Sequence, residues 1–193
     1  MRRKDKHPLK EMETTMAIGL NSRFRLRKLT PRVCIQSNVL TNNHTSNNHT
    51  SQYDVDRFVN FAMQRGIENL NIIIGIKLPP SILSCKTLKV LKLERIMVND
   101  LSQHQVNFPV LKTLHLKRVC FELHENLVKI LSGCPMLEEL KTKYLRVDSL
   151  VDSLVPKKEL EGLLPNLFKA TISYDSIIPV TFVRNVESLC LQV

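Results

Sequence analysis

The chain has 193 residues, of which 43% are hydrophobic and 24% charged, and it carries a formal net charge of +10. This composition suits one folded domain with a hydrophobic core, while the five glycines and the absence of tryptophan disfavour glycine-rich phosphate loops and aromatic girdles. No apolar run reaches the roughly 18 residues of a membrane span, and the N-terminus lacks the apolar core of a signal peptide. We therefore expect an intracellular protein, cytoplasmic or nuclear, with no membrane partner.

The basic charge is concentrated in the N-terminal segment. Residues 1–32 contain ten Lys or Arg and three acidic residues, a net charge of +7, so the remaining 161 residues carry +3. We predict that residues 1–52 form a basic, partly disordered segment with one half-buried strand over 23–34 and a polar loop over 41–51. The basic arm leaves open an alternative function, a nuclear or nucleic-acid-associated protein. No DNA- or RNA-binding motif accompanies it, so no specific nucleic acid is expected as a partner.

A short amphipathic helix is predicted directly after the polar loop. Asp54 is a suitable N-cap, and Gly66 is a suitable stop signal. The apolar residues that share one face of this helix are Val55, Phe58, Val59, Ala62 and Met63.

A single motif, L-x-x-L-x-L, then recurs to the end of the chain. Three copies are clean (IENLNI, LKVLKL and LKTLHL) and three are weaker (LEELKT, LFKATI and VESLCL). Their first positions are Ile67, Leu88, Leu111, Leu137, Leu167 and Val186. Most of the steps between them fall in the range of roughly 20 to 29 residues that is typical of leucine-rich repeats. Residues 53–193 are therefore predicted to form a leucine-rich-repeat domain of about six irregular repeats.

The expected fold class is α/β: a solenoid with a curved parallel β-sheet on its concave side and short helices and loops on its convex side. Helical returns are expected at Pro80–Cys85 and at Asn126–Gly133, the latter ended by Gly133. The alternative is a helical protein in which leucines match the motif by chance. The alternation of charged and apolar residues, and the prolines that precede the motif at Pro109, Pro135 and Pro165, favour strands.

The repeats lack the asparagine ladder that often occupies the ninth template position. That position holds Gly75, Ile96, Val119, Leu145 and Asp175. A decayed gene whose isolated product is only marginally stable is therefore a third possibility.

The candidate functional surface is the concave face of the sheet, where the residues between the template leucines point to solvent. The middle strands place basic side chains close together, which motivates the hypothesis of an acidic segment of a protein target. The candidate protein-binding residues are Lys92, Glu94, Thr113, His115, Lys117, Glu139, Lys141 and Lys143. The alternative is that these lysines only keep an exposed sheet soluble. No catalytic motif, metal-ligand spacing or cofactor motif is present, so we expect no enzyme activity, no metal and no cofactor.

The stretches VDRFVNFAMQRGIENLNI, LPPSILSCKTLKVLKLERI, FPVLKTLHLKRVCF and LVKILSGCPMLEEL closely resemble the repeat region of plant F-box/LRR proteins, which often carry a C-terminal FBD domain. The resemblance implies a non-enzymatic protein–protein interaction module of the kind that binds substrates of cullin-based ubiquitin ligases. In that family an N-terminal F-box binds the Skp adaptor. Residues 1–52 do not show the F-box pattern, so we expect a truncated, divergent or partial gene product in which the Skp adaptor and cullin are not recruited.

Overall fold

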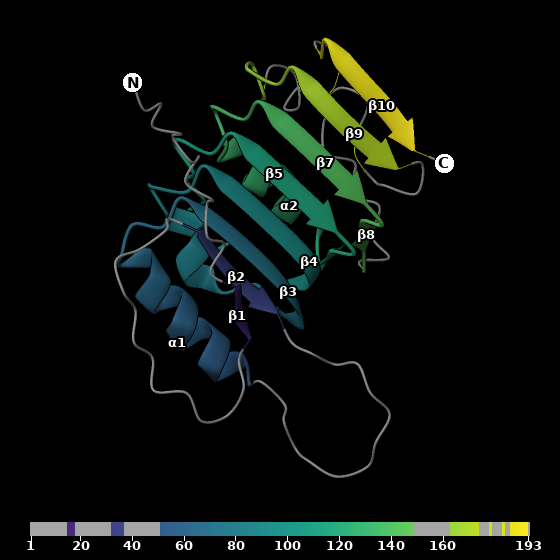
Figure 1. Ribbon diagram of the computed structural model, residues 1–193. Helices are drawn as coiled ribbons and strands as arrows, with labels where there is room; N and C mark the ends of the chain where they lie inside the picture. The colour runs from purple at the N-terminus through teal and green to yellow at the C-terminus, as the bar shows by residue number, and fades with distance from the viewer. Residues whose placement is uncertain are drawn as a thin grey trace, which may run out of the picture.

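The computed structural model describes residues 15–17, 32–36, 51–148, 163–173, 178, 183 and 186–192. Its centre is a parallel β-sheet whose strands follow one another in nearly sequential order (Figure 1). The main path runs through β1 (Thr15–Ala17), β2 (Arg32–Gln36), β3 (Asn69–Lys77), β4 (Val90–Val98), β5 (Thr113–Lys117), β7 (Glu139–Lys143), β9 (Lys169–Ser173) and β10 (Ser188–Gln192). The short strands β6 (Cys120–Phe121) and β8 (Arg146–Val147) pair with each other, and β6 also pairs with the end of β4.

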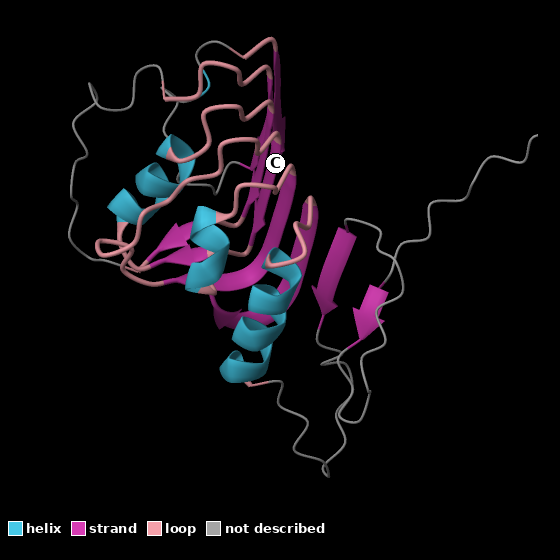
Figure 2. Cartoon of the chain, turned by 90° about the vertical axis from the view of Figure 1, so that its left-hand side faces the viewer, coloured by secondary structure: helices cyan, strands magenta, loops and turns pink. Residues whose placement is uncertain are grey.

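Three helical segments lie on one side of this sheet, as Figure 2 shows. They are α1 (Gln52–Met63), the 3₁₀ helix η1 (Pro80–Ser84) and α2 (His124–Ser132). The two helical returns predicted between strands are thus confirmed. The predicted fold class is also confirmed: parallel strands form one side, short helices and loops form the other, and the sheet does not close into a barrel.

The pairing register confirms the phase of the repeats. Leu70 lies opposite Leu91, Leu91 opposite Leu114, and Leu114 opposite Leu140, all at the second template leucine. These leucines are buried, as are the first and third template residues of the same four repeats. Because strand side chains alternate between faces, one apolar stripe from each repeat fills a continuous core.

The sheet also extends to the N-terminal side of the first predicted repeat. In β2, Val33 pairs with Leu70 and Ile35 with Ile72, so these two residues occupy template positions. Their repeat was missed because a long polar insertion separates it from the next copy. The predicted strand over 23–34 overlaps β2 only at 32–34. Residues 23–31 and most of the predicted loop, 41–50, lie outside the described residues, and the domain boundary at residue 53 stays a prediction.

The predicted helix forms, but its N-cap is Ser51 and not Asp54. The Ser51 hydroxyl accepts a hydrogen bond from the Asp54 backbone N–H at 3.1 Å and donates one to the Asp54 carboxylate at 2.7 Å. Asp54 therefore lies in the first turn, where the positive end of the helix dipole stabilises its negative charge. The helix ends at Met63, and Gly66 follows with φ +66°, the left-handed conformation that glycine adopts most easily.

The ninth template position is filled by apolar side chains in three consecutive repeats. Ile96, Val119 and Leu145 are each at most 2% exposed, so they extend the core at the position where other leucine-rich repeats often carry an asparagine ladder. In the first repeat Gly75 is exposed and the register shifts between Ile73 and Ile76.

A buried asparagine instead stabilises the convex side. Asn126, in the first turn of α2, donates from Nδ2 to the Asn99 carbonyl at 3.0 Å, and its Oδ1 accepts from the Leu101 N–H at 3.0 Å. Lys129 donates to the Leu101 carbonyl at 2.7 Å. These bonds fix α2 to the loop of the preceding repeat, because a buried amide must satisfy both its donor and its acceptor.

Candidate functional site

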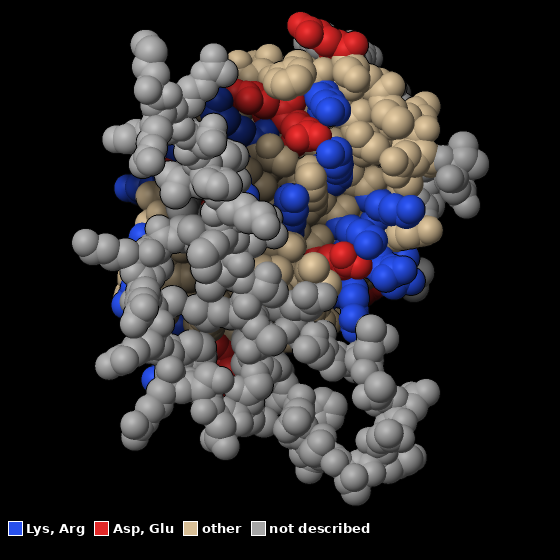
Figure 3. Space-filling model, in the orientation of Figure 1, with Lys and Arg blue, Asp and Glu red and all other residues tan. Residues whose placement is uncertain are grey.

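The register of the sheet brings the predicted concave residues together in three rows across the strands. The central row contains Lys92, His115 and Lys141, which are direct neighbours on β4, β5 and β7. Neighbouring strands lie about 4.8 Å apart, so these three side chains share one strip of surface. Figure 3 shows basic side chains gathered on this face of the molecule, with fewer acidic ones between them.

His115 is the electrostatic centre of the central row. Burial, followed by the positive charges of Lys141 and Lys92, lowers the pKa of His115 to about 4, and Glu139 opposes this shift. The histidine is therefore neutral at pH 7, and the crowding of like charges is relieved by the loss of its proton. Its Nε2 atom is buried and has no hydrogen-bond partner among the described residues.

A second row, towards the amino ends of the strands, contains Thr113 and Glu139 side by side. The Glu139 carboxylate binds Lys141 at 2.8 Å and lies 3.8 Å from the ammonium of Lys169. The hydrogen bond from Lys141, more than any other contact, lowers the pKa of Glu139. One lysine of the central row is thus paired within the protein, while Lys92 has no ion pair in the part of the chain that the structure describes.

The third row, towards the carboxyl ends of the strands, contains Glu94, Lys117 and Lys143. Glu94 accepts from Lys117 at 3.0 Å and lies 3.7 Å from the guanidinium of Arg118. Lys143 approaches the ring of Tyr144, with its ammonium 5.2 Å from the ring centroid. All eight predicted residues thus lie on three adjacent strands, but the two glutamates neutralise part of the positive charge.

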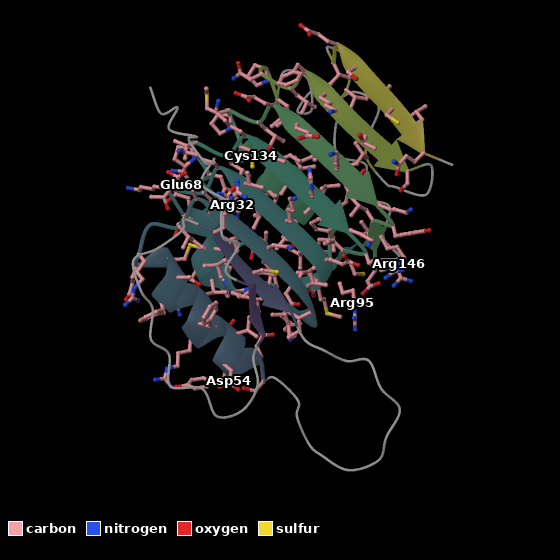
Figure 4. All side chains as sticks on the ribbon, in the orientation of Figure 1. Arg32, Asp54, Glu68, Arg95, Cys134 and Arg146 are labelled. Atoms are coloured by element: carbon pink, nitrogen blue, oxygen red, sulfur yellow. The ribbon has the colours of Figure 1, made fainter. Side chains whose placement is uncertain are left out.

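Four further residues continue this surface past the third row, and the repeat motif did not predict them. Arg95, Arg118 and Tyr144 occupy the same position in successive repeats, directly after the third row, and Arg146 begins β8. Figure 4 places Arg95 and Arg146 at the same end of the sheet. A signal was present in the sequence, because each of these repeats continues past its last template residue with two polar residues (ER, KR and KY) and then an apolar one.

The described residues contain neither a metal site nor a membrane-spanning helix. No three His, Cys, Asp or Glu side chains come together as a metal site there. No helix in the described ranges is both long enough and apolar enough to cross a membrane. The basic arm at 1–32, on which the nucleic-acid alternative depends, lies outside the described residues except for 15–17 and Arg32.

Comparison with known proteins agrees with the repeat architecture. The family defined by the leucine-rich repeats of the FBD-associated F-box protein At5g56370 matches residues 55–154. Among relatives from Arabidopsis thaliana, the F-box/LRR-repeat protein At4g14103 is 38% identical over 88 residues, which cover 43% of this chain and 23% of the relative. The putative FBD-associated F-box protein At5g53635 is 34% identical over 104 residues, 54% of this chain and 24% of the relative.

The match extends further in the F-box/FBD/LRR-repeat protein At5g56420, also from Arabidopsis thaliana. It is 38% identical over 130 residues, which cover 65% of this chain and 30% of that protein. The matched region thus spans less than a third of the length of these relatives. No solved structure matches the chain. The family match covers more than half of the chain and coincides with the stacked repeats, so this chain belongs to the leucine-rich-repeat family of FBD-associated F-box proteins.

Proposed function

We propose that this chain is a non-enzymatic protein-interaction module whose concave face binds an acidic segment of a protein target. The supporting observation is the central row, in which two lysines flank a histidine that has lost its proton. An acidic segment across this row would supply the negative charge that the row lacks. Complementary charge of this kind steers association and selects partners.

The paired lysines define which part of the face is available. Lys117 and Lys141 are held by Glu94 and Glu139, so they present less free charge than their number suggests. Lys92 is exposed and lies beside His115. We therefore expect the target segment to place an acidic side chain at Lys92 and then to run over His115 towards Lys141.

The relatives are named as F-box proteins, and on that basis the target would be a substrate presented for ubiquitination. In this proposal the repeats supply target binding, and recruitment of a Skp adaptor and cullin is a separate activity. The two are tested separately: affinity purification of the tagged 193-residue chain from plant extract, with antibodies to the adaptor and to cullin, reports recruitment alone.

Target binding is tested with a neutral double variant, Lys92→Gln with Lys141→Gln. Charge reversal would place new carboxylates beside Glu94 and Glu139, so neutralisation is the cleaner change. We expect a fluorescent library of acidic nine-residue peptides to bind the wild-type chain and to bind the variant at least tenfold more weakly, measured by fluorescence anisotropy. A matched control, Arg57→Gln with Lys86→Gln, removes the same charge from exposed residues on α1 and in the loop before β4. Equal affinities of the two double variants would refute the proposal.

A further inference from the structure

Three adjacent strands share an unusual backbone conformation directly after the third row, within β4 and just beyond the ends of β5 and β7. Arg95, Arg118 and Tyr144 have φ values of 60°, 52° and 57°, in the left-handed region that favours glycine. A residue with a side chain pays about 1 kcal/mol or more to adopt it. The three residues follow Glu94, Lys117 and Lys143, which are neighbours across the sheet, so all three lie side by side directly past the third row.

This end of the sheet carries more positive charge than the protein itself neutralises. Glu94 lies within ion-pairing distance of Lys117 and Arg118. Within the described ranges, Arg95, Lys143 and Arg146 form no ion pair with a carboxylate. Figure 3 shows a corresponding concentration of basic side chains at one edge of the face, over the carboxyl ends of the strands.

A hollow lies among these charges. Its walls are Arg118, Val119, Cys120, Tyr144 and Arg146, and its volume is about 400 Å³. The guanidinium of Arg118 lies 5.9 Å from the centroid of the Tyr144 ring. Burial, then a hydrogen bond to Asp148, raises the pKa of the Cys120 thiol to about 11, so the thiol itself is uncharged at pH 7. The Asp148 carboxylate adds one negative charge beside it. The hollow is thus lined by two arginines, one tyrosine ring and two uncharged residues, with one carboxylate beside Cys120.

The chemistry of this cluster fits a doubly charged group better than a carboxylate. One guanidinium group can bind two phosphate oxygens at once. A phosphorylated side chain also carries a charge of about −1.5 to −2 on one group. A single carboxylate would satisfy one of the unpaired cations and leave the others. Arg118 lies three positions after His115, about 10 Å along a strand, so one extended peptide can reach both places.

We propose that Arg95, Arg118, Lys143, Tyr144 and Arg146, here named the edge cluster, bind a phosphoserine or phosphothreonine in the segment held on the concave face. Arg118 and Arg146 contact the phosphoryl oxygens, Arg95 and Lys143 add long-range attraction, and the Tyr144 ring packs against the carbon atoms of the phosphorylated side chain. This inference rests on the proposed function for its partner class, a peptide, but it uses different residues.

The test compares three degenerate nine-residue libraries by fluorescence anisotropy at constant ionic strength. One has a central phosphoserine, one a central serine, and one a central serine with two added glutamates that match the charge of the phosphoserine library. We expect the wild-type chain to bind the phosphoserine library at least tenfold more tightly than either of the others. Equal affinity for the phosphoserine and charge-matched libraries would overturn the assignment.

Paired variants separate this site from the central row. Arg118→Gln with Arg146→Gln should reduce the phosphoserine preference to less than twofold, while Lys92→Gln with Lys141→Gln should weaken all three libraries equally and keep the preference. The Arg57→Gln and Lys86→Gln control should change neither. If only the central-row variant lost the phosphoserine preference, the assignment of phosphoryl binding to the edge cluster would be contradicted. A retained preference without any effect of Lys92 and Lys141 would refute the proposed function and leave the edge cluster standing.

A second pair guards against misfolding at the strained turn. Arg118→Lys with Arg146→Lys keeps both charges and removes the planar fork that binds two oxygens at once. We expect this variant to unfold at the same urea concentration as the wild type and to lose at least half of the phosphoserine preference. An undiminished preference in the lysine variant would show that charge alone is read and would contradict phosphoryl recognition by the two arginines.

Discussion

At the scale of single residues, His115 links the electrostatics of the concave face to stability. Its pKa is about 4 in the folded protein and 6.5 for an unperturbed histidine. Between these pH values the unfolded chain binds a proton that the folded chain does not. The free energy of unfolding therefore falls as the pH falls from 6.5 to 4, and the stabilisation is fully present above pH 6.5.

Replacing His115 with Gln should remove this contribution. After discounting for solvent screening of a half-buried group, we expect the wild type to lose about 1 kcal/mol more than the variant between pH 7 and pH 4, measured by urea denaturation. Glu139, whose pKa is lowered, also contributes to acid destabilisation, but the difference between the two curves largely cancels it. The exposed His104, changed to Gln, is the matched control. Parallel curves for wild type and His115→Gln would contradict the prediction.

At the scale of elements, α2 shows that a stop signal in the sequence can act for a reason other than the expected one. Gly133 ends the helix as predicted, but its φ is −74°, which any residue can adopt. Glycine is required there for space: a Cβ atom would lie 2.7 Å from Val106 Cγ1 and 2.9 Å from the Val106 carbonyl oxygen. The close approach lets the loop before β5 pack on the end of α2, where Phe108 donates its N–H to the Gly133 carbonyl at 2.8 Å.

Gly133→Ala should therefore destabilise the protein by about 1–3 kcal/mol, the usual cost of overpacking. Gly75→Ala is the matched control, since its nearest neighbour would be the Arg95 guanidinium at 4.0 Å, and we expect a change below about 0.5 kcal/mol. Both are measured by urea denaturation. A Gly133→Ala protein as stable as the wild type would mean that the Val106 backbone moves aside freely.

At the scale of the whole molecule, each described strand on the main path pairs with those of the neighbouring repeats, so stability is expected to vary along the stack. The central strands β4 and β5 have partners on both sides and buried template leucines. Among the described strands β10 pairs with β9 alone, and its template residues Leu189 and Leu191 are 47% and 68% exposed. Strands with few buried contacts open most easily.

Native-state hydrogen exchange should follow this gradient. We expect the backbone amides of β10 to exchange at least a hundredfold faster than those of β4 and β5 that donate to neighbouring strands, with β9 in between. Mass spectrometry of peptic fragments resolves these segments. Uniform protection from β3 to β10 would indicate one cooperative unit and would contradict a nearest-neighbour solenoid with a weak C-terminal strand.

The sequence alone determined the repeat phase, the parallel sheet, both helical returns and the membership of three strands in one basic surface. It could do so because burial imposes a strict period: Leu91, Leu114 and Leu140 recur at the positions that face the core, and their neighbours must then face outwards. The repeat at Val33 and Ile35 escaped detection because a single copy, separated by a polar insertion, has no period to recognise.

Only the tertiary structure decided which charges on that surface are free. Whether Glu94 neutralises Lys117 and whether His115 keeps its proton depend on distances between strands and on burial, which spacing along the chain does not specify. The edge cluster likewise depends on the left-handed backbone at Arg95, Arg118 and Tyr144, which the sequence pattern does not reveal. Periodicity fixes what must be buried, whereas the electrostatics of exposed groups follow from the three-dimensional arrangement of neighbours that are distant in sequence.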